Sequence, residues 1–200
     1  MKLYILRHAE TEWNREDRIQ GQMDSPITRE GKEAIAVMAR RLASVPFDCC
    51  YTSDLPRARQ TAEGLLKSRR VPIIEEEALR ELPLGSWEGM RFKDILNDPV
   101  AQAYLKTPEI YHRAGYMDFY DLYDKLSAFL RRIERSGHDH VLIVGHGVSI
   151  RAFYHVMEGV AVKDFWSRPI AASMGLGICA YEKGAWRVLR RADREDGLSY

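Results

Sequence analysis

The stretch Leu3–Ala9 reads LYILRHA and places an arginine and a histidine directly after an apolar run. A second stretch of the same kind, Val141–Gly147, reads VLIVGHG. Short apolar runs of this length are typical of buried strands. Arg7, His8 and His146 therefore follow strand ends, and open α/β sheets bind ligands at the carboxyl ends of their strands. Because an arginine beside a histidine favours an anion, we expect both histidines to share one phosphate-binding edge of the sheet.

Strand and helix patterns alternate through the rest of the chain. Strands are expected over Lys2–Leu6, Phe47–Thr52, Val71–Ile74, Val141–Gly145, Ser173–Tyr181 and Ala185–Arg191, with a turn at Lys183-Gly184 between the last two. Helices are expected over Thr28–Val45, Asp54–Ser68 and Val148–Met157, the first capped by Thr28 and stopped by Pro46. This alternation predicts an α/β protein: a three-layer α/β/α sandwich with a central, mostly parallel mixed sheet.

The chain has 200 residues, which favours one domain spanning 1–200. An excursion at about 92–124 is too long for an ordinary connection and is rich in tyrosine. We expect this segment to form a partly helical lid over the sheet edge, with its tyrosines serving as local core more than as ligand contacts. The polar tail Asp193–Tyr200 is expected to fray.

Composition narrows the possible partners. Lys plus Arg total 30 and Asp plus Glu total 29, so no overall field favours nucleic acid or a membrane surface. Cys49, Cys50 and Cys179 show no metal-ligand spacing and are expected to be reduced packing thiols. The chain enters a strand pattern at once, and no apolar run approaches the length of a membrane helix. We expect a cytoplasmic protein with no membrane or nucleic-acid partner; its oligomeric state is not encoded in any pattern.

Phosphoryl transfer requires donors that spread the phosphoryl charge, an in-line nucleophile and an acid for the leaving oxygen. Arg7 and Arg57 can grip phosphate bidentately, and Asn14 can donate without adding charge. Either His8 or His146 could attack phosphorus through a neutral ring nitrogen, because nearby arginines disfavour an imidazolium. No metal is needed if the arginines supply the positive charge, and no acidic metal cluster is evident.

The acid is expected in the loop Leu79–Met90, which reads LRELPLGSWEGM. Glu81 is the first choice, because the like charge of a bound phosphate favours a protonated carboxyl that can donate to the leaving oxygen. Glu88 is the competing choice. The alternatives are plain structural roles, with Arg57 a charge on a helix surface and Glu81 a surface carboxylate.

Together these motifs resemble the histidine phosphatase superfamily, also called the phosphoglycerate mutase-like family. The opening RHAETEWN over Arg7–Asn14 is similar to the family signature RHGETxxN, with Ala9 in place of the commoner glycine. Further blocks follow in order: Gln20–Gly31, Ser53–Ala62, Glu81–Gly89 and Val144–Gly147. The Gly-Glu-Ser segment usual in phosphatase-like members is replaced by AGYMDFYD over Ala114–Asp121, which leaves the substrate open.

The resemblance implies a role for each motif residue. His8 would be the phosphorylated nucleophile and Glu81 the proton donor. The phosphate pocket would comprise Arg7, Arg57 and His146, aided by Asn14, with peripheral substrate contacts at Gln20, Gly21 and Gly147. The resemblance also implies an α/β/α sandwich that uses neither a metal nor an organic cofactor.

The expected function is a metal-independent phosphomonoesterase of the histidine acid phosphatase type. It would act on a small phosphorylated metabolite through a phosphohistidine. One alternative is a phosphoglycerate mutase, although mutases usually have longer chains; another is a non-catalytic phosphate-binding regulatory module. The aromatic segment at about 92–124 favours a ring-bearing or weakly charged leaving group, such as a nucleoside or sugar.

Overall fold

The computed structural model describes residues 1–192, which form a six-stranded sheet in the order β3-β2-β4-β1-β5-β6. Four neighbouring strands run parallel: β1 (Lys2–Arg7), β2 (Cys49–Thr52), β3 (Ile73–Glu75) and β4 (His140–Gly145). Two antiparallel strands extend the sheet beyond β1, namely β5 (Leu176–Glu182) and β6 (Ala185–Arg190). The predicted mixed, mostly parallel sheet is confirmed.

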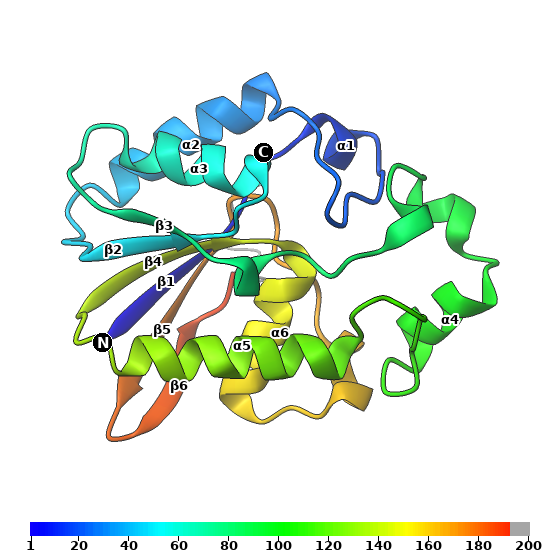
Figure 1. Cartoon of the computed structure of the whole chain (residues 1–200). Helices are drawn as coiled ribbons and strands as arrows, with labels where there is room; N and C mark the ends of the chain where they lie inside the picture. The colour runs from blue at the N-terminus through cyan, green and yellow to red at the C-terminus, as the bar shows by residue number, and fades with distance from the viewer. Residues whose placement is uncertain (193–200) are drawn as a thin grey trace.

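Helices cover both faces of this sheet (Figure 1). Helices α2 (Arg29–Arg41) and α3 (Pro56–Leu66) lie on one face, and α5 (Phe119–Glu134) and α6 (Gly147–Glu158) lie on the other. Successive residues of β4 supply both cores: Leu142 and Val144 pack with α2 and α3, whereas Val141 and Ile143 face the other way. A strand buried on both faces needs apolar residues at every position, which explains the unbroken apolar run in β4.

The first long helix ends earlier than expected. Thr28 caps α2 as predicted, since its hydroxyl accepts from the Gly31 amide at 2.9 Å. The helix then ends at Arg41, so the prediction that Pro46 stops it is wrong. The chain can leave the helix here because the Arg69 guanidinium donates to the carbonyls of Leu42 at 3.1 Å and of Val45, beyond the helix end. These bonds satisfy carbonyls that would otherwise need another helical turn.

The segment between β3 and α5 contains short helices joined by loops. These are η1 (Glu77–Leu79), η2 (Gly85–Trp87), η3 (Phe92–Ile95) and α4 (Pro99–Lys106). Figure 1 shows α4 beyond the end of the sheet, on the side where α1 (Glu12–Arg15) also lies. This agrees with the predicted excursion at the sheet edge; its action as a lid stays a prediction.

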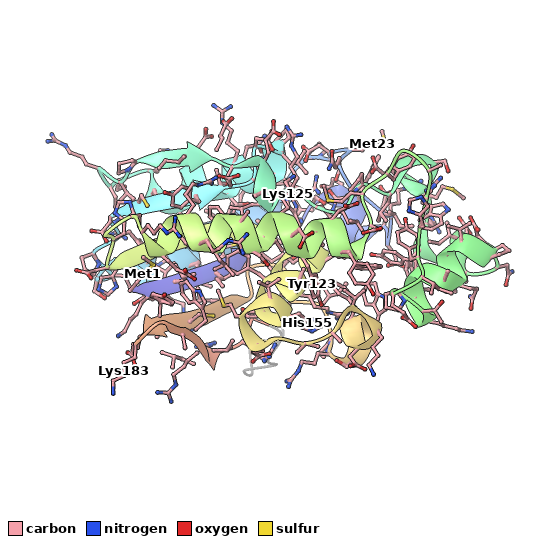
Figure 2. All side chains as sticks on the ribbon, turned by 60° about the horizontal axis from the view of Figure 1, so that its bottom comes forward. Met1, Met23, Tyr123, Lys125, His155 and Lys183 are labelled. Carbon is pink, nitrogen blue, oxygen red and sulfur yellow. The ribbon has the colours of Figure 1, made fainter. Side chains whose placement is uncertain are left out.

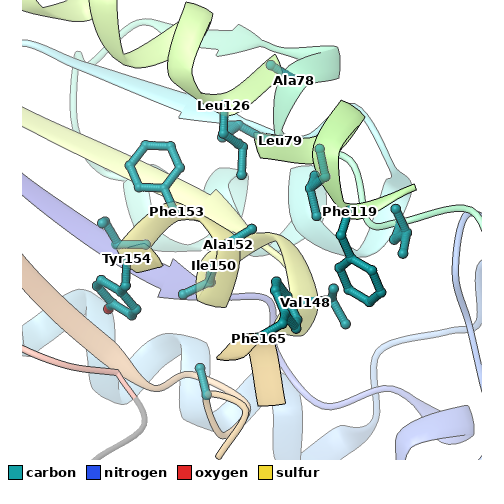
Figure 3. Close-up of a cluster of buried hydrophobic side chains, with 14 of the residues drawn as sticks. Ala78, Leu79, Phe119, Leu126, Val148, Ile150, Ala152, Phe153, Tyr154 and Phe165 are labelled. Atoms are coloured by element: carbon teal, nitrogen blue, oxygen red, sulfur yellow. The ribbon is translucent and has the colours of Figure 1, made fainter. Parts of the chain in front are cut away.

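Helix α5 was not predicted, although its pattern is present in the sequence. Asp118 caps its start by accepting from the amides of Tyr120 and Asp121. Apolar residues at helical spacing, beginning with Phe119 and Leu122, are buried along one side. Figure 3 shows how this side meets α6: Phe119 and Leu126 lie on α5, and Val148 and Phe153 on α6. The tyrosines before and at the helix start interrupt the periodic pattern of apolar residues, so the start at Phe119 is hard to recognise from the sequence.

The C-terminal hairpin forms as predicted. Lys183 and Gly184 both have positive φ, 52° and 80°, which suits a two-residue turn between β5 and β6. The six-residue helix η4 (Val162–Ser167) precedes this hairpin. The tail Asp193–Tyr200 lies outside the described residues. Over 1–192, no helix is both long and apolar enough to span a membrane.

Replacing Phe119 with alanine should lower the free energy of unfolding by roughly 3–5 kcal/mol. The Phe119 ring is fully buried, with the rings of Phe165 and Tyr104 at 4.4 Å and 5.2 Å between centroids. Urea denaturation followed by circular dichroism measures the loss. The neighbouring Tyr120 is 53% exposed, so Tyr120→Ala is the matched control, with an expected change within about 0.5 kcal/mol. Equal losses for the two variants would contradict the anchoring role of Phe119.

Candidate active site

The register of two central strands brings the histidines together. β1 pairs with β4 in parallel, with Arg7 opposite Gly145, so His8 and His146 leave the sheet side by side. The His8 amide donates to the Gly145 carbonyl at 2.9 Å, and the two rings lie 5.2 Å apart between centroids. The expected shared edge is therefore present.

The His8 ring is held in one tautomer. Its Nδ1 lies 2.7 Å from the carbonyl oxygen of Ala9, and a carbonyl can only accept, so Nδ1 carries the proton. Nε2 then keeps its lone pair. Burial, followed by the charges of Arg57 and Arg7, lowers the pKa of His8 well below 6.5. The ring is accordingly neutral near pH 7 and has the form required of a nucleophile.

His146 lies deeper than His8. It is fully buried at the start of α6, and neither ring nitrogen has a hydrogen-bond partner among residues 1–192. Burial, Arg57, His8 and Arg7 together lower the pKa of His146 well below 6.5. Unpaired buried ring nitrogens are costly in a folded protein, so this position suits a ring that meets a bound anion.

Arg57 is a buried charge, which rules out the alternative of a plain charge on a helix surface. It is 1% exposed, at the start of α3. The turn that contains Gly21, Met23 and Asp24 holds its guanidinium. Nη2 donates to the Gly21 carbonyl at 2.7 Å, and Nη1 donates to the Met23 carbonyl at 2.7 Å and to Asp24 Oδ1 at 3.1 Å. The Asp24 carboxylate balances part of the positive charge of Arg57. The Nε of Arg57 has no hydrogen-bond partner within the described part of the chain.

Arg7 extends from the end of β1 toward the start of α6. Its Nη1 donates to the Ala171 carbonyl at 2.7 Å, and its buried Nε has no partner among the residues described. A Cβ added at Gly147 would lie 3.6 Å from Arg7 Cζ and only 2.6 Å from Ile170 Cγ2. Glycine at 147 therefore lets the segment that carries Ile170 close over the helix start beside Arg7.

Three of the four residues predicted to contact the substrate line the same cavity. Gly147 does not line it and instead lies beside the Arg7 side chain. Asn14, Gln20 and Gly21 all line the cavity. Asn14 Oδ1 accepts from the amide and the hydroxyl of Thr11 at 3.1 and 3.0 Å, which leaves its amide nitrogen to donate. The Gly21 carbonyl is occupied by Arg57.

Glu81 lies at the cavity, fastened to the first turn of α6. Its Oε1 accepts from the amides of Leu82 at 3.2 Å and Ser149 at 2.9 Å, and its Oε2 accepts from the Val148 amide at 3.0 Å. Oε1 accepts two of these bonds and Oε2 only one, so Oε2 is the oxygen with a lone-pair site left open. Glu81 is thus not a free surface carboxylate.

Glu88, the competing acid, is a structural carboxylate and does not line the cavity. Its Oε1 accepts from the amides of Gln22, Leu84 and Gly85 at 3.1, 2.8 and 3.2 Å, and its Oε2 from that of Met23 at 3.1 Å. These four bonds join the turn that holds Arg57 to the loop that carries Glu81. Gly21 has φ +52°, and a Cβ there would lie 2.2 Å from Glu88 Oε1. Glycine at 21 is therefore required for the two loops to meet.

The cavity has a volume of about 200 Å³. At its base lie Arg7, His8, Arg57 and Glu81. Its remaining walls are mostly apolar and comprise Ile19, Leu84, Trp87, Phe92, Ile95, Tyr104, Leu105, Val148, Trp166 and Ile170. Trp166 and Ile170 were not anticipated, because no motif or periodicity marks them. Tyr104 is buried in the local core as expected, yet it also lines the cavity.

A larger groove of about 580 Å³ lies elsewhere, between α5, α6 and η4. Figure 2 shows Tyr123 of α5 and His155 of α6 in this region, and the Tyr123 hydroxyl lies 2.9 Å from His155 Nδ1. No arginine is among its described lining residues, so its chemistry does not match that of the smaller cavity. Among residues 1–192, no group of three or more His, Cys, Asp or Glu side chains is arranged to hold a metal ion.

The small cavity combines three capabilities. The guanidiniums of Arg7 and Arg57 can hold an oxyanion, a neutral imidazole can attack it, and a carboxyl beside them can exchange a proton. Of the residues anticipated for catalysis, Arg7, His8, Arg57 and Glu81 line this cavity. His146 is not in its lining, but its ring lies 5.2 Å from that of His8 between centroids.

Known proteins share this sequence and fold. The family model of the histidine phosphatase superfamily (branch 1) matches residues 3–194. Phosphoserine phosphatase 1 of Hydrogenobacter thermophilus is 29% identical over 84% of this chain and 81% of its own length. A protein named "Probable phosphoglycerate mutase GpmB" from Klebsiella pneumoniae is 32% identical over 80% of this chain and 76% of its own. The solved structure of Bacillus stearothermophilus YhfR superposes with a TM-score of 0.89 at 32% identity, covering 96% of this chain and 97% of that one.

The ring resonances of His8 should stay unchanged between about pH 7.5 and 5.5 in the free protein. Its lowered pKa means that the neutral ring persists as the pH falls through 6.5. Ring-selective NMR spectra, assigned by comparison with His8→Ala, provide the measurement. A titration midpoint near 6.5 would show that the two arginines and burial do not keep the ring neutral.

Proposed function

The chain belongs to the histidine phosphatase superfamily (branch 1), and on this basis we propose that it hydrolyses phosphate monoesters of small metabolites through a phosphohistidine at His8. The observation that carries the proposal is the bond of His8 Nδ1 to the Ala9 carbonyl, next to the buried Arg57 and the half-buried Arg7. It prepares Nε2 for attack next to groups that can hold a phosphoryl group. The named relatives, a phosphoserine phosphatase and a phosphoglycerate mutase, use substrates of this size class.

In the first step, the Nε2 lone pair of His8 attacks phosphorus and the bond from phosphorus to the ester oxygen breaks. Arg7, Arg57 and His146 donate to the phosphoryl oxygens as their charge redistributes, and Asn14 donates from its amide. The leaving oxygen takes the electron pair and a proton from Glu81, carried on the open site of Oε2. The carbonyl of Ala9 stabilises the positive ring through the Nδ1 proton.

In the second step, water attacks the phosphohistidine. The Glu81 carboxylate accepts a proton from the water as its oxygen bonds to phosphorus, and the bond from phosphorus to nitrogen breaks. The electron pair returns to Nε2, which restores the neutral ring and the protonated acid. Gln20, Gly21 and Gly147 complete the surroundings of the substrate in this proposal. The arginines supply the positive charge, so the scheme uses no metal or cofactor.

The second candidate is mutase activity, supported by the 32% identity to the named phosphoglycerate mutase. The two activities share the first step and differ in what removes the phosphoryl group from His8. Incubation with a phosphoglycerate, followed by analysis of isomers and free phosphate, separates them. A phosphate-binding regulatory module, the third possibility, would release phosphate from no ester. The excursion at about 92–124 would act as the lid in either enzyme.

His8→Ala should abolish covalent labelling by a small radiolabelled phosphodonor such as acetyl phosphate, because the attacking nitrogen is lost. Acid-labile, alkali-stable label on the quenched protein is the measurement. His112→Ala is the control, since that side chain is 73% exposed, and it should label like the parent protein. Label retained in His8→Ala would mean that His146 or another group attacks.

Glu81→Gln should affect poor leaving groups most. Loss of the proton donor should lower kcat/KM for an alkyl phosphate by roughly 10²- to 10⁴-fold. The loss for 4-nitrophenyl phosphate should be below about tenfold, because its leaving oxygen needs little protonation. Steady-state phosphate release measures both, with exposed Glu63→Gln as the matched control. Equal losses for the two esters would remove Glu81 from the acid role.

A further inference from the structure

The walls above the phosphate-holding residues form an apolar compartment. Trp87, Tyr104 and Trp166 come from three separate segments, yet their rings touch in a row. Tyr104 lies 6.1 Å from Trp87 and 5.1 Å from Trp166 between centroids. Phe92 and Ile170 also line this cavity, and each is 37% exposed to solvent. Exposed apolar side chains beside a concave apolar wall indicate a contact surface for an apolar ligand group.

The polar atoms of this wall are already used inside the protein. Trp87 Nε1 donates to Asp98 Oδ2 at 2.9 Å, and Trp166 Nε1 donates to the Tyr104 carbonyl at 2.5 Å. Behind Trp166, the Arg151 guanidinium carbon lies 4.7 Å from the ring centroid. The two indoles are thus fixed in place and offer carbon surface, not N–H donors, to a ligand.

Basic side chains are poorly placed to bind a second anion. Besides Arg7 and Arg57, the basic residue lining the cavity in the described chain is Arg18. Arg18 Nε pairs with Glu16 at 2.5 Å, and its Nη1 donates to the Gly89 carbonyl at 2.7 Å. Arg113 packs on Trp87 and donates to the Leu84 carbonyl at 2.7 Å, outside the lining. Within residues 1–192, a substrate carboxylate would therefore be desolvated against largely apolar walls and would compete with Glu16 for Arg18, which is unfavourable.

We infer that this compartment takes the apolar, ring-bearing or branched alcohol part of a phosphate monoester and disfavours a carboxylated one. The inference rests on the proposed phosphatase function. It separates this chain from the substrates named for its phosphoserine phosphatase and phosphoglycerate mutase relatives. The inferred compartment also disfavours the nucleoside or sugar leaving group expected from the sequence, because its wall has few free polar groups that could bind their hydroxyls.

The test compares isosteric substrates. In 3-phosphonooxypropanoate a carboxylate replaces the isopropyl end of 3-methylbutyl phosphate, so shape is kept while charge changes. We expect kcat/KM to be at least about 30-fold higher for 3-methylbutyl phosphate, and 2-phenylethyl phosphate to be used as well or better. Phosphoserine should behave like the carboxylated isostere.

Two variants test the wall itself. Trp166→Ala should lower kcat/KM for 2-phenylethyl phosphate by about 10- to 100-fold while changing ethyl phosphate less than about threefold. Ile170→Arg places a cation beside the mouth and should raise kcat/KM for 3-phosphonooxypropanoate at least about tenfold. Val37→Arg adds the same charge at an exposed apolar position on α2 and should leave the substrate preference unchanged.

The outcomes separate the two proposals. Equal or better use of the carboxylated isostere, with phosphate still released and His8 still labelled, would overturn the apolar compartment and leave the phosphatase intact. If Ile170→Arg does not raise kcat/KM for 3-phosphonooxypropanoate, the apolar compartment is contradicted, even where Trp166→Ala does not fold. Absence of phosphate release from every ester, including ethyl phosphate, would overturn the phosphatase and this inference together.

Discussion

The parallel pairing of β1 with β4 is the constraint on which the rest of the site depends. Because Arg7 lies opposite Gly145 at the ends of the two strands, the histidine that follows each strand lies beside the other. Side chains in a sheet alternate between faces, so a slip of one residue would turn one of these rings away from the other. β4 is buried on both faces, and β1 buries Leu3 and Ile5 in one core and Leu6 in the other, which makes such a slip costly. The hydrophobic core thereby sets the geometry of the polar site.

The site concentrates positive charge and yet keeps an uncharged base. The buried Arg57 and the half-buried Arg7 lie beside His8, and their charges act with burial of the His8 ring to lower its pKa. The same buried guanidiniums would be costly without acceptors, and the protein supplies several, mostly carbonyls: those of Ala171, Gly21 and Met23. Carbonyl acceptors fix the guanidiniums without fully cancelling their charge, so attraction for an anion is retained.

Glu88 joins the two loops that position Arg57 and Glu81. One carboxylate accepts from four backbone amides in two loops separated by more than sixty residues. One loop provides the carbonyls that orient Arg57, and the other carries Glu81 to the first turn of α6. A half-buried carboxylate with four such bonds ties the segment that holds Arg57 to the segment that carries Glu81. The apolar compartment is then built on top by the segments that contain Tyr104 and Trp166.

Much of the fold and the base of the site could be predicted from local patterns. The apolar runs at β1 and β4, the Thr28 cap and the turn at Lys183-Gly184 depend on neighbouring residues, so the sequence alone indicates them. Knowing that parallel strands end at one edge was sufficient to group His8 with His146. The early end of α2 was not predictable, because it depends on Arg69, which lies 24 residues beyond Val45 in the chain.

The strands and the polar residues that follow them can be read from the amino-acid sequence, because both are encoded in short stretches of chain. Only the tertiary structure decided that Glu88 joins two loops while Glu81 faces the cavity, although both lie in one loop of acidic and apolar residues. It also decided that Trp166 and Ile170 line the cavity. The physical reason is that such contacts arise when distant segments pack to bury apolar surface, and no local period encodes which segments meet.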